Sequence, residues 1–441
     1  MLKSFYLNNL VYYIAGSAAA VFVLSYFFPG FFRLGELILL LLGIAVVIDS
    51  LLAYSKHNGI FGERITSDRF SIGDSNKVVI RLFNHYAFPV QVSIIDELPV
   101  QFQERKWIRK INISRNAGYL LEYFLQPVTR GEYFFENINV FVHAPLQLVK
   151  RRYTFAAKET VKVYPSYVQM RRYQLLAVSN RLQEVGVKSI RKIGHSMEFE
   201  QIKEYVRGDD NRTINWKATA RKDGLMVNNY TDERSQQIYC LINKGRVMKM
   251  PFAGMTLLDY AINASLVLSN VALVKQDKAG IITFEKNLDT FLPADKKPTQ
   301  MNLILETLYK QKTEFLEADF EKLFSAIRNR ITNRSLLILF TNFESVESLL
   351  REMAALKKIA HYHLLLVVFF ENTELKSLID KKAATLEDIY IKTIAEKFAY
   401  EKRLMVKELH KNGIPSILTT PENLTVNTVN KYLELKNKLS I

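Results

Sequence analysis

The chain has 441 residues, and its 60 Lys and Arg residues outnumber its 44 Asp and Glu residues to give a formal net charge of +16 at pH 7. The hydrophobic fraction of 49% supports folded cores, and the length allows roughly two or three ordinary domains. The single cysteine, Cys240, excludes an intrachain disulfide framework and fits a reducing compartment. A basic chain can bind nucleic acid, anionic lipid or an acidic protein. Because the sequence has no Arg-rich tract, RNA-binding aromatic motif or zinc-finger spacing, we expect no nucleic acid partner, and a cationic surface that binds nucleic acid is the weaker alternative.

Two uninterrupted apolar stretches occupy residues 10–28 and 37–54. Each is long enough to cross a membrane as a helix, which takes roughly 20 residues. The short linker between them, residues 29–36, is rich in turn residues and edged with aromatics. We therefore predict a transmembrane helical hairpin over residues 1–58. A cleavable signal peptide is the alternative for the first stretch, but that stretch is too long and no small-residue cleavage site precedes the second one.

Charge outside the two stretches predicts their orientation. Positive residues flank the hairpin on both sides, whereas the linker carries one Arg balanced by one Glu, so the positive-inside rule places both ends in the cytoplasm. Asp49 lies in the last turns of the second stretch, where it is either a functional intramembrane carboxylate or an interfacial residue. The flanking positive residues are Lys3, Lys56, His57 and Arg64, and the linker pair is Arg33 and Glu36.

Residues 59–165 favour strands. Apolar and polar residues alternate in runs such as 90–94 and 119–125, as expected for strands with one buried face. Glycine and asparagine turns recur between the runs, which is typical of a small antiparallel sandwich. This region has no pair of carboxylates and no nucleophile arrangement, so we expect it to act as a spacer or a binding surface.

Beyond a basic linker over residues 166–236, strand and helix patterns alternate from residue 237 to residue 441. The helix over residues 386–410 begins with Thr385 and Asp388 in a capping-box arrangement. Strands separated by helices predict a mostly parallel sheet covered on both faces, with ligands bound beyond the carboxyl ends of its strands. The expected strands cover residues 238–242, 280–284, 336–340, 364–370 and 415–418.

The segment 198–221, EFEQIKEYVRGDDNRTINWKATAR, closely resembles the signature of the family called domain of unknown function fifty-eight. The resemblance implies a multi-domain protein: an N-terminal transmembrane helical hairpin, an all-β sandwich over residues 59–165, and a doubly wound α/β domain like that of von Willebrand factor A over residues 237–441. It also implies a two-pass protein of the bacterial inner membrane with its soluble domains in the cytoplasm. The implied partners are a MoxR-type AAA+ ATPase and other envelope proteins.

Charge is concentrated in this signature segment. Its two adjacent acids suit a helix N-terminus, its Trp can anchor that helix to a core, and its Arg residues can satisfy the acids. An internal charge network is the favoured interpretation, and a charged surface that binds the ATPase partner is the alternative. The candidate residues are Arg207, Asp209, Asp210, Arg212, Trp216 and Arg221.

The resemblance also implies a divalent ion at the carboxyl edge of the sheet, held by Asp-x-Ser-x-Ser after the first strand and an Asp after a central strand. In this chain Asn243, Gly245 and Val247 stand at the first three positions, and Asn342 replaces the second acid. Because Mg²⁺ usually needs at least about one or two carboxylates, we expect this degenerate site to hold no ion.

Lys244 and Arg246 add positive charge beside the degenerate site, where we expect them to attract an acidic peptide directly. The alternative is that other acids rebuild the ion site. Candidates for that role are Asp259, Asp319 and Glu344.

No Gly-rich phosphate loop and no Ser-His-Asp arrangement can be identified in the sequence. We therefore expect a non-enzymatic, membrane-anchored adaptor that works without a cofactor, with a MoxR-type AAA+ ATPase, in cell-envelope protein assembly or maturation. The alternative is a metal-dependent ligand-binding domain, von Willebrand A-like, with a rebuilt ion site.

Overall fold

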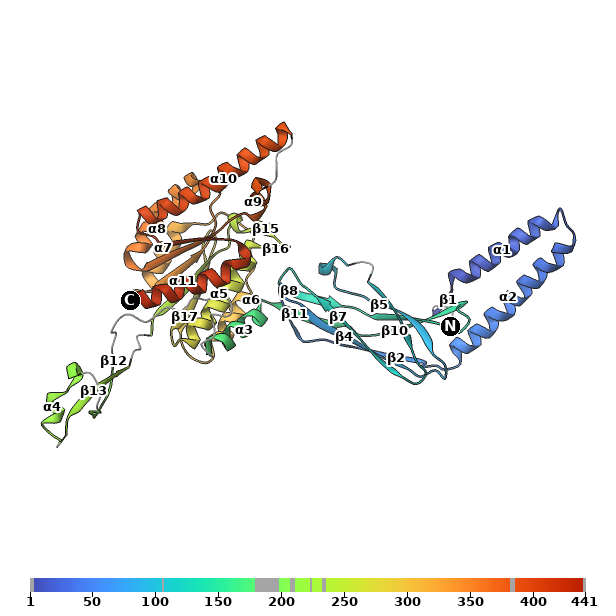
Figure 1. The fold of residues 1–441 in the computed structure, drawn as a ribbon, viewed down its shortest axis with the longest axis horizontal. Helices are drawn as coiled ribbons and strands as arrows, with labels where there is room; N and C mark the ends of the chain where they lie inside the picture. The colour runs from blue at the N-terminus through green and yellow to red at the C-terminus, as the bar shows by residue number, and fades with distance from the viewer. Residues whose placement is uncertain are drawn as a thin grey trace. The chain divides into compact units, whose positions relative to one another are not determined.

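A computed structural model of the chain describes residues 4–104, 107–178, 198–206, 211–222, 224–231, 235–380 and 385–438. The chain divides into two compact units, Met1–Tyr164 and Pro165–Ile441. The first unit contains two apolar helices and a β-sandwich, and the second contains an α/β fold with a mixed sheet (Figure 1).

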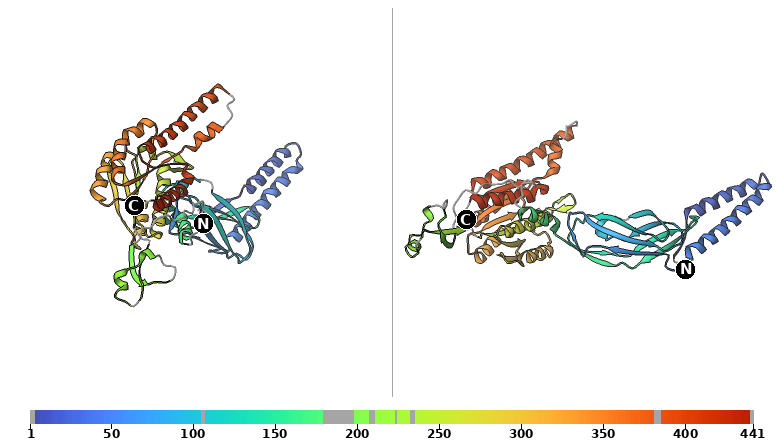
Figure 2. Two further views of the ribbon diagram at one scale, coloured as in Figure 1. Left: turned by 60° about the vertical axis from the view of Figure 1, so that its left-hand side comes forward. Right: turned by 60° about the horizontal axis from the view of Figure 1, so that its bottom comes forward.

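Two consecutive helices, α1 (Asn9–Ser25) and α2 (Gly30–Tyr54), lie near the start of the first unit. They lie side by side in every view (Figure 2). The predicted linker over residues 29–36 is wrong, because α2 already begins at Gly30. Pro29 stands at its N-cap with φ −57°, and a proline is compatible with the start of a helix, where no N–H partner is needed.

By length and composition, α2 is apolar enough to cross a membrane, and 11% of its most apolar window is buried. Helix α1 is also apolar but has 17 residues. Helix α5 (Leu257–Val274) of the second unit passes the same test, but 83% of its window is buried, as in the core helix of a soluble domain.

The predicted β-sandwich is confirmed, and one strand from before the helices joins it. β1 pairs antiparallel with β10, a pairing that the sequence analysis missed. In β5 the alternation is confirmed, because the side chains of Val90, Val92 and Ile94 are at most 2% exposed. In β7 it holds only near the end, where Tyr123 and Leu125 are buried. The sheets are β1-β10-β9-β5-β6, β2-β4-β7 and β3-β11-β8. The strands are β1 (Phe5–Leu7), β2 (Ile60–Ile65), β3 (Arg69–Ser71), β4 (Asn76–Asn84), β5 (Val90–Asp96), β6 (Ile108–Ile113), β7 (Gly118–Leu125), β8 (Gly131–Phe135), β9 (Ile138–His143), β10 (Val149–Phe155) and β11 (Glu159–Tyr164).

The second unit is built on a six-stranded sheet in the order β18-β17-β14-β19-β20-β21. All neighbouring strands are parallel except β17 and β18, which are antiparallel. The predicted, mostly parallel sheet is thus confirmed, and β18 at one edge makes it mixed. The strands are β14 (Gln237–Asn243), β17 (Lys278–Phe284), β18 (Leu288–Asp295), β19 (Leu336–Phe340), β20 (Leu364–Phe370) and β21 (Ser416–Thr419).

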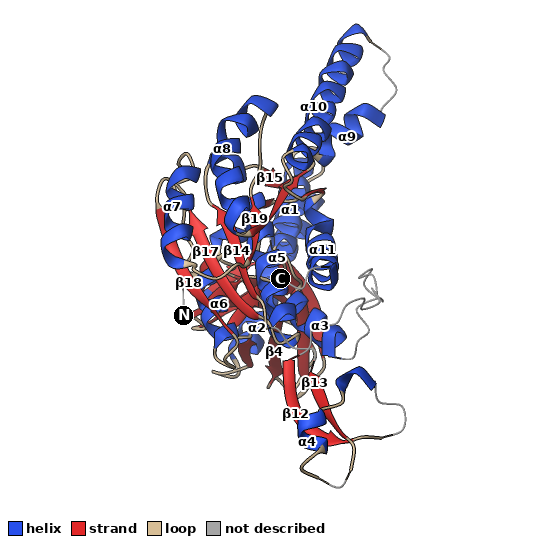
Figure 3. Cartoon of the chain, turned by 90° about the vertical axis from the view of Figure 1, so that its left-hand side faces the viewer, coloured by secondary structure: helices blue, strands red, loops and turns tan. Residues whose placement is uncertain are grey.

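Helices cover both faces of this sheet (Figure 3). Alternate residues of β14 contribute to two separate cores, Cys240 to one and Leu241 to the other. The first core includes α3, α5, α6 and α11, and the second includes α7, α8 and α10. The bounds are α3 (Tyr167–Val178), α6 (Gln300–Tyr309), α7 (Phe320–Arg330), α8 (Val346–Tyr362), α9 (Thr373–Asp380), α10 (Leu386–Lys411) and α11 (Leu424–Lys438).

Local sequence signals explain the ends of the longest helix. The predicted capping box of α10 is confirmed, because the Thr385 hydroxyl accepts from the Asp388 N–H and the Asp388 carboxylate accepts from the Thr385 N–H, both at 3.1 Å. Beyond the end of α10, Gly413 has φ +73°, a conformation that glycine adopts without strain.

The start of the signature segment forms one strand of a small two-stranded sheet. Strand β12 (Glu198–Glu204) pairs antiparallel with β13 (Met226–Thr231), and the short helix α4 (Trp216–Thr219) lies between them in the chain. Two further short strands, β15 (Pro251–Phe252) and β16 (Met255–Thr256), pair with each other before α5.

Candidate functional site

The two asparagines of the degenerate ion site lie at the carboxyl edge of the sheet, where the parallel strands β14 and β19 end. Both are buried, with Asn243 1% and Asn342 9% exposed. Asn243 donates its Nδ2 to the Thr341 hydroxyl at 2.9 Å and accepts from the Gly245 N–H at 2.7 Å. Its amide therefore bridges the loops that follow β14 and β19.

Gly245 is required by close packing. A Cβ at this position would lie 2.9 Å from the Leu316 carbonyl oxygen and 3.0 Å from Asn243 Oδ1. Both distances are too short for ordinary contacts. This loop therefore has no room for the serine that the Asp-x-Ser-x-Ser motif has at this position. Val247 is partly exposed in the short 3-10 turn η5 (Arg246–Met248) and offers no oxygen.

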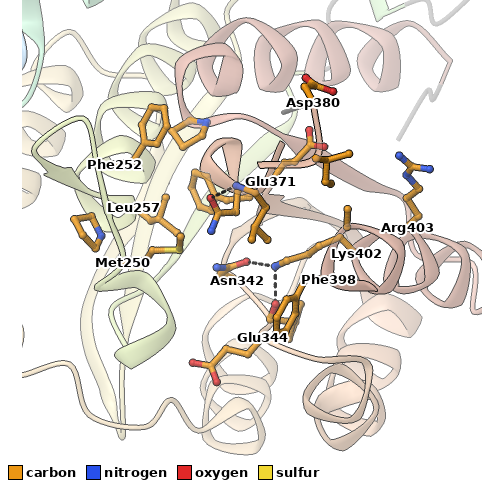
Figure 4. Close-up of a pocket in the computed structure, with 18 residues that line it drawn as sticks. Met250, Phe252, Leu257, Asn342, Glu344, Glu371, Asp380, Phe398, Lys402 and Arg403 are labelled. Carbon is orange, nitrogen blue, oxygen red and sulfur yellow. Dashed lines mark hydrogen bonds between the residues drawn. The ribbon is translucent and has the colours of Figure 1, made fainter. Parts of the chain in front are cut away.

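A lysine ammonium contacts the second asparagine. Lys402 of α10 donates from Nζ to Asn342 Oδ1 at 2.7 Å and to the Phe343 carbonyl at 2.6 Å (Figure 4). The ammonium also lies 5.7 Å from the centre of the Phe369 ring. Burial lowers the pKa of Lys402 to about 8, and the nearby charge of Glu344 partly offsets that effect.

These contacts do not fit a divalent cation. Asn342 Oδ1 accepts from an ammonium, and Asn243 Oδ1 accepts from a backbone N–H. Two of the three candidate replacement acids lie at helix starts: Asp259 accepts from the Thr256 hydroxyl at 2.7 Å, and Asp319 accepts from the first turn of α7. The third, Glu344, lies 3.8 Å from Arg246. Within the described ranges, no group of three or more His, Cys, Asp or Glu side chains is placed to hold a metal ion.

Of the two cations predicted beside the degenerate site, only one is exposed. Lys244 is 3% exposed, and its Nζ donates to Asp289 and to the Lys312 carbonyl, each at 2.7 Å. Its predicted role in attracting a peptide is therefore wrong, because the ammonium is already paired inside the fold. Arg246 has a side chain 76% exposed and lies 3.8 Å from Glu344.

A pocket of about 500 Å³ opens at the same edge of the sheet. Its walls come from the loops after β19 and β20, from α9 and α10, and from the β15–β16 turn. The lining is mainly apolar, with Lys402 among the polar groups (Figure 4). Its apolar side chains include Met250, Phe252, Leu257, Phe370, Leu375 and Phe398.

The structure describes only part of the predicted charge cluster in the signature. Arg207, Asp209 and Asp210 lie outside the described residues, as does the side chain of Arg212. The cap of α4 is supplied by Asn215, whose Oδ1 accepts from the Ala218 N–H at 2.9 Å.

The remaining two signature candidates are exposed. Trp216 is 69% exposed, so the expectation that it anchors a helix in a core is wrong. Arg221 is exposed as well. Helix α4 has only four residues and buries none of them.

The C-terminal half of α2 is attached to the sandwich through Asp49, which is fully buried. Its two oxygens accept hydrogen bonds from the backbone N–H groups of Leu146, Leu148 and Val149, each at 2.9 Å. Asp49 therefore bonds to a loop of the sandwich, an arrangement that neither sequence interpretation considered.

Arg151 of β10 strengthens the same junction. Its guanidinium donates to the carbonyls of Ala53, Lys56 and His57 at 2.9, 2.7 and 2.9 Å. It also lies 4.4 Å from the centre of the Tyr54 ring. These bonds satisfy carbonyls at and beyond the end of α2, which have no partner within the helix.

Sequence reasoning missed Lys402 and Arg151. Each stands in an ordinary amphipathic or strand pattern, and each binds backbone or amide groups 59 to 98 positions away. No local pattern marks such a residue. The one available signal was the pair of acid-to-amide replacements at Asn243 and Asn342, which leaves room for a cation supplied by the protein.

Comparisons with known proteins agree with the signature. Residues 201–395 match the family described as "Protein of unknown function DUF58". "Uncharacterized protein YeaD" of Bacillus subtilis (strain 168) is 28% identical over 186 residues, a match that spans 39% of this chain and 44% of the relative. This chain thus matches less than half the length of that curated relative.

Two solved structures share limited similarity with the chain. The conserved hypothetical protein BatB from Bacteroides thetaiotaomicron is 13% identical with a TM-score of 0.31, over 46% of this chain and 100% of that one. A CARDB domain from Pyrococcus furiosus is 14% identical with a TM-score of 0.18, over 24% of this chain and 86% of that one. Neither similarity is close enough to define a fold or a function here.

Proposed function

We propose that this chain, a member of the DUF58 family over residues 201–395, is a membrane-anchored, non-enzymatic adaptor that binds a partner protein through its signature segment. The observation that carries the proposal is the exposure of Trp216 within that segment. Tryptophan is enriched among the residues that dominate binding energy at protein interfaces.

The apolar helices support the membrane anchor. Leucine and valine side chains of α2 are widely exposed, for example Leu40 at 60% and Val47 at 58%. Contiguous exposed apolar surface of this extent is unfavourable in water and favourable in lipid. In this proposal α1 and α2 cross the membrane as a hairpin, and Asp49 lies where α2 leaves the bilayer.

Charge supports a cytoplasmic location for both soluble units. Lys56 lies two positions beyond the end of α2, and Lys3 precedes α1. Arg64, which was also counted toward the orientation, is paired with Asp96 inside the sandwich and contributes little charge to the surface. The positive-inside rule therefore rests on fewer residues, but its direction is unchanged.

The family resemblance implies the class of partner, a MoxR-type AAA+ ATPase of the cell envelope, and a von Willebrand A-like character for the α/β unit. A stable attachment between α2 and the sandwich suits an adaptor, because it fixes the sandwich relative to its anchor. The metal-dependent alternative is not favoured, because Lys402 already supplies a cation to Asn342.

Co-purification tests this proposal. The full chain in detergent is expected to retain a MoxR-type ATPase encoded in the same genome. Trp216→Ala is expected to weaken the complex by about 2 kcal/mol or more, since exposed anchors of this type dominate interfaces. Phe124→Ala is the matched control, because Phe124 is also an exposed aromatic, at 62%, but lies in the sandwich.

Two outcomes would contradict the proposal in different ways. If the unaltered chain reproducibly retains no ATPase, the partner class is wrong. If Trp216→Ala and Phe124→Ala bind equally well, with both variants folded, the signature segment is not the binding surface.

A further inference from the structure

Lys402 is an unusual lysine because it reaches the carboxyl edge of the sheet and meets only neutral acceptors there. An ammonium has three N–H donors. Among the described residues, its hydrogen-bond partners are two, Asn342 Oδ1 and the Phe343 carbonyl. Each of these oxygens orients the charge, but neither neutralises it.

The charge of Lys402 also lacks an ion-pair partner in the described part of the chain, where no carboxylate oxygen lies within 4.0 Å of Nζ. A partly buried ammonium without a counter-ion is unfavourable unless something else binds it. The lowered pKa of Lys402 reflects this cost. The charge of Glu344 offsets this cost only in part, so a bound anion would complete the arrangement.

The pocket in front of the ammonium indicates what kind of anion fits. Its volume of about 500 Å³ lies within the range of roughly 300–1,000 Å³ that is typical of small-molecule sites. Phe252, Leu257 and Phe398 line this pocket together with Lys402 (Figure 4). An inorganic anion would leave these apolar walls uncovered, whereas an apolar group joined to a carboxylate would cover them.

We propose that this pocket binds a carboxylate attached to an apolar body, with Lys402 donating to the carboxylate. Two sources share this chemistry: the apolar last residue of a polypeptide, and a small free carboxylic acid. The site is separate from the signature segment, so the proposal depends neither on the ATPase partner nor on Trp216.

Acids that line the pocket do not occupy the ammonium. Among the described residues, the ion-pair partner of Glu344 is Arg246, at 3.8 Å. Asp380 and Arg403 also line the pocket, and no hydrogen bond joins either of them to the Lys402 ammonium (Figure 4). Besides Lys402 and Glu344, the lining thus contains one positive group, Arg403, and two further acids, Glu371 and Asp380, while Lys402 contacts the Asn342 amide.

Calorimetric titration of the full chain in lipid nanodiscs tests the proposal. The probes are N-acetyl-Ala-Leu-Phe with a free C-terminal carboxylate, the same peptide as its C-terminal amide, and 3-phenylpropionate. We expect saturable binding of at least one free acid and a loss of about tenfold or more for the amide, because a charged hydrogen bond is lost. Tighter binding of the peptide identifies a chain end as the source, and tighter binding of 3-phenylpropionate identifies a free acid.

Variants test the role of Lys402 itself. Lys402→Met is expected to lower the affinity for the acid about tenfold or more, whereas Lys407→Met, an exposed lysine on the same helix, is expected to leave it unchanged. Lys402→Met leaves two carbonyl oxygens without a donor, so thermal unfolding checks that the variant still folds. The comparison of acid and amide uses the unaltered chain and is valid even if the variant does not fold. Absence of acid binding up to about 5 mM, equal binding of acid and amide, or unchanged binding by a folded Lys402→Met variant would each overturn the proposal.

Discussion

The Asp49 carboxylate accepts a hydrogen bond from the Val149 backbone N–H at 2.9 Å, across one hundred positions of the chain. The same oxygen accepts from Leu148, and the other oxygen accepts from Leu146. A charged acceptor of three backbone N–H groups in a fully buried position links the apolar helix α2 to the sandwich. The junction is therefore part of the fold of the first unit.

Asp49→Ala is expected to lower the free energy of unfolding of the first unit by about 3 kcal/mol or more, because three backbone N–H groups, two of them buried, lose the carboxylate that accepts from them. Thermal unfolding of the full chain in detergent measures this loss. Glu36→Gln is the matched control, since Glu36 is an exposed acid of the same helix. A melting temperature that is the same for both variants would show that Asp49 does not hold the junction.

The sandwich contains a buried ion pair, Arg64 with Asp96, whose side chains are 1% and 0% exposed. The Tyr123 hydroxyl donates to the same carboxylate, and burial together with the charge of Asp96 raises the pKa of Tyr123. Arg64→Met removes one partner and leaves Asp96 buried and uncompensated, which is expected to cost about 3–5 kcal/mol.

The matched control for this pair is Arg81→Met. Arg81 also pairs with an acid, Glu63, at 3.5 Å, but both side chains are about half exposed. An exposed pair of this kind contributes roughly 0–1 kcal/mol. Chemical denaturation compares the two variants, and equal losses of stability would contradict the assignment of Arg64 as a buried structural charge.

Cys240 is the only cysteine of the chain, which allows a simple test of the α/β core. It is 1% exposed, and burial raises the pKa of its thiol to about 12. Because the thiolate is the reactive form, a thiol reagent at mildly alkaline pH is expected to leave the native chain unmodified. One thiol should react after unfolding in denaturant. Rapid labelling of the folded chain would contradict the burial of Cys240 in β14.

His143 at the end of β9 is expected to make stability depend on pH. Burial and two nearby lysines, Lys150 and Lys110, lower the pKa of His143 from 6.5 to about 4. The unfolded chain then binds more protons than the folded chain between these values, so the stability contributed above pH 6.5 is lost as pH falls through about 4.

The measurement is the difference in unfolding free energy between the unaltered chain and His143→Gln over this pH range. The subtraction removes the contribution of carboxylates that titrate in both proteins, and glutamine retains a group that can bond to the Ser93 hydroxyl, 3.1 Å from His143 Nε2. A difference that does not change with pH would contradict the lowered pKa of His143.

The sequence predicted much of the fold because its signals are local. Strands β19 and β20 have the predicted bounds, since each is a continuous apolar run that ends at turn residues. The start of α2 was misplaced because the glycines at residues 30 and 35 were interpreted as turn signals. In the structure both are helical, and the Gly35 backbone passes close to the Phe22 ring.

The candidate site was predicted only in part, because its chemistry depends on distant contacts. The burial of Asn243 and Asn342 at one edge follows from two parallel strands that end together. Whether a neighbouring cation is free does not follow from its position. Lys244 and Arg246 are two residues apart, yet one is enclosed beside Asp289 and the other is exposed.

The sequence by itself determined the apolar helices, the alternating strands of the sandwich, the α/β order and the signature of the family, because each depends on the spacing of residues along a short stretch. Only the tertiary structure decided that Lys402 meets Asn342, sixty positions earlier in the chain, and that Asp49 binds a loop of the sandwich. The physical reason is that an ammonium or a buried carboxylate takes whichever oppositely polarised groups the packing of distant elements brings within hydrogen-bond distance.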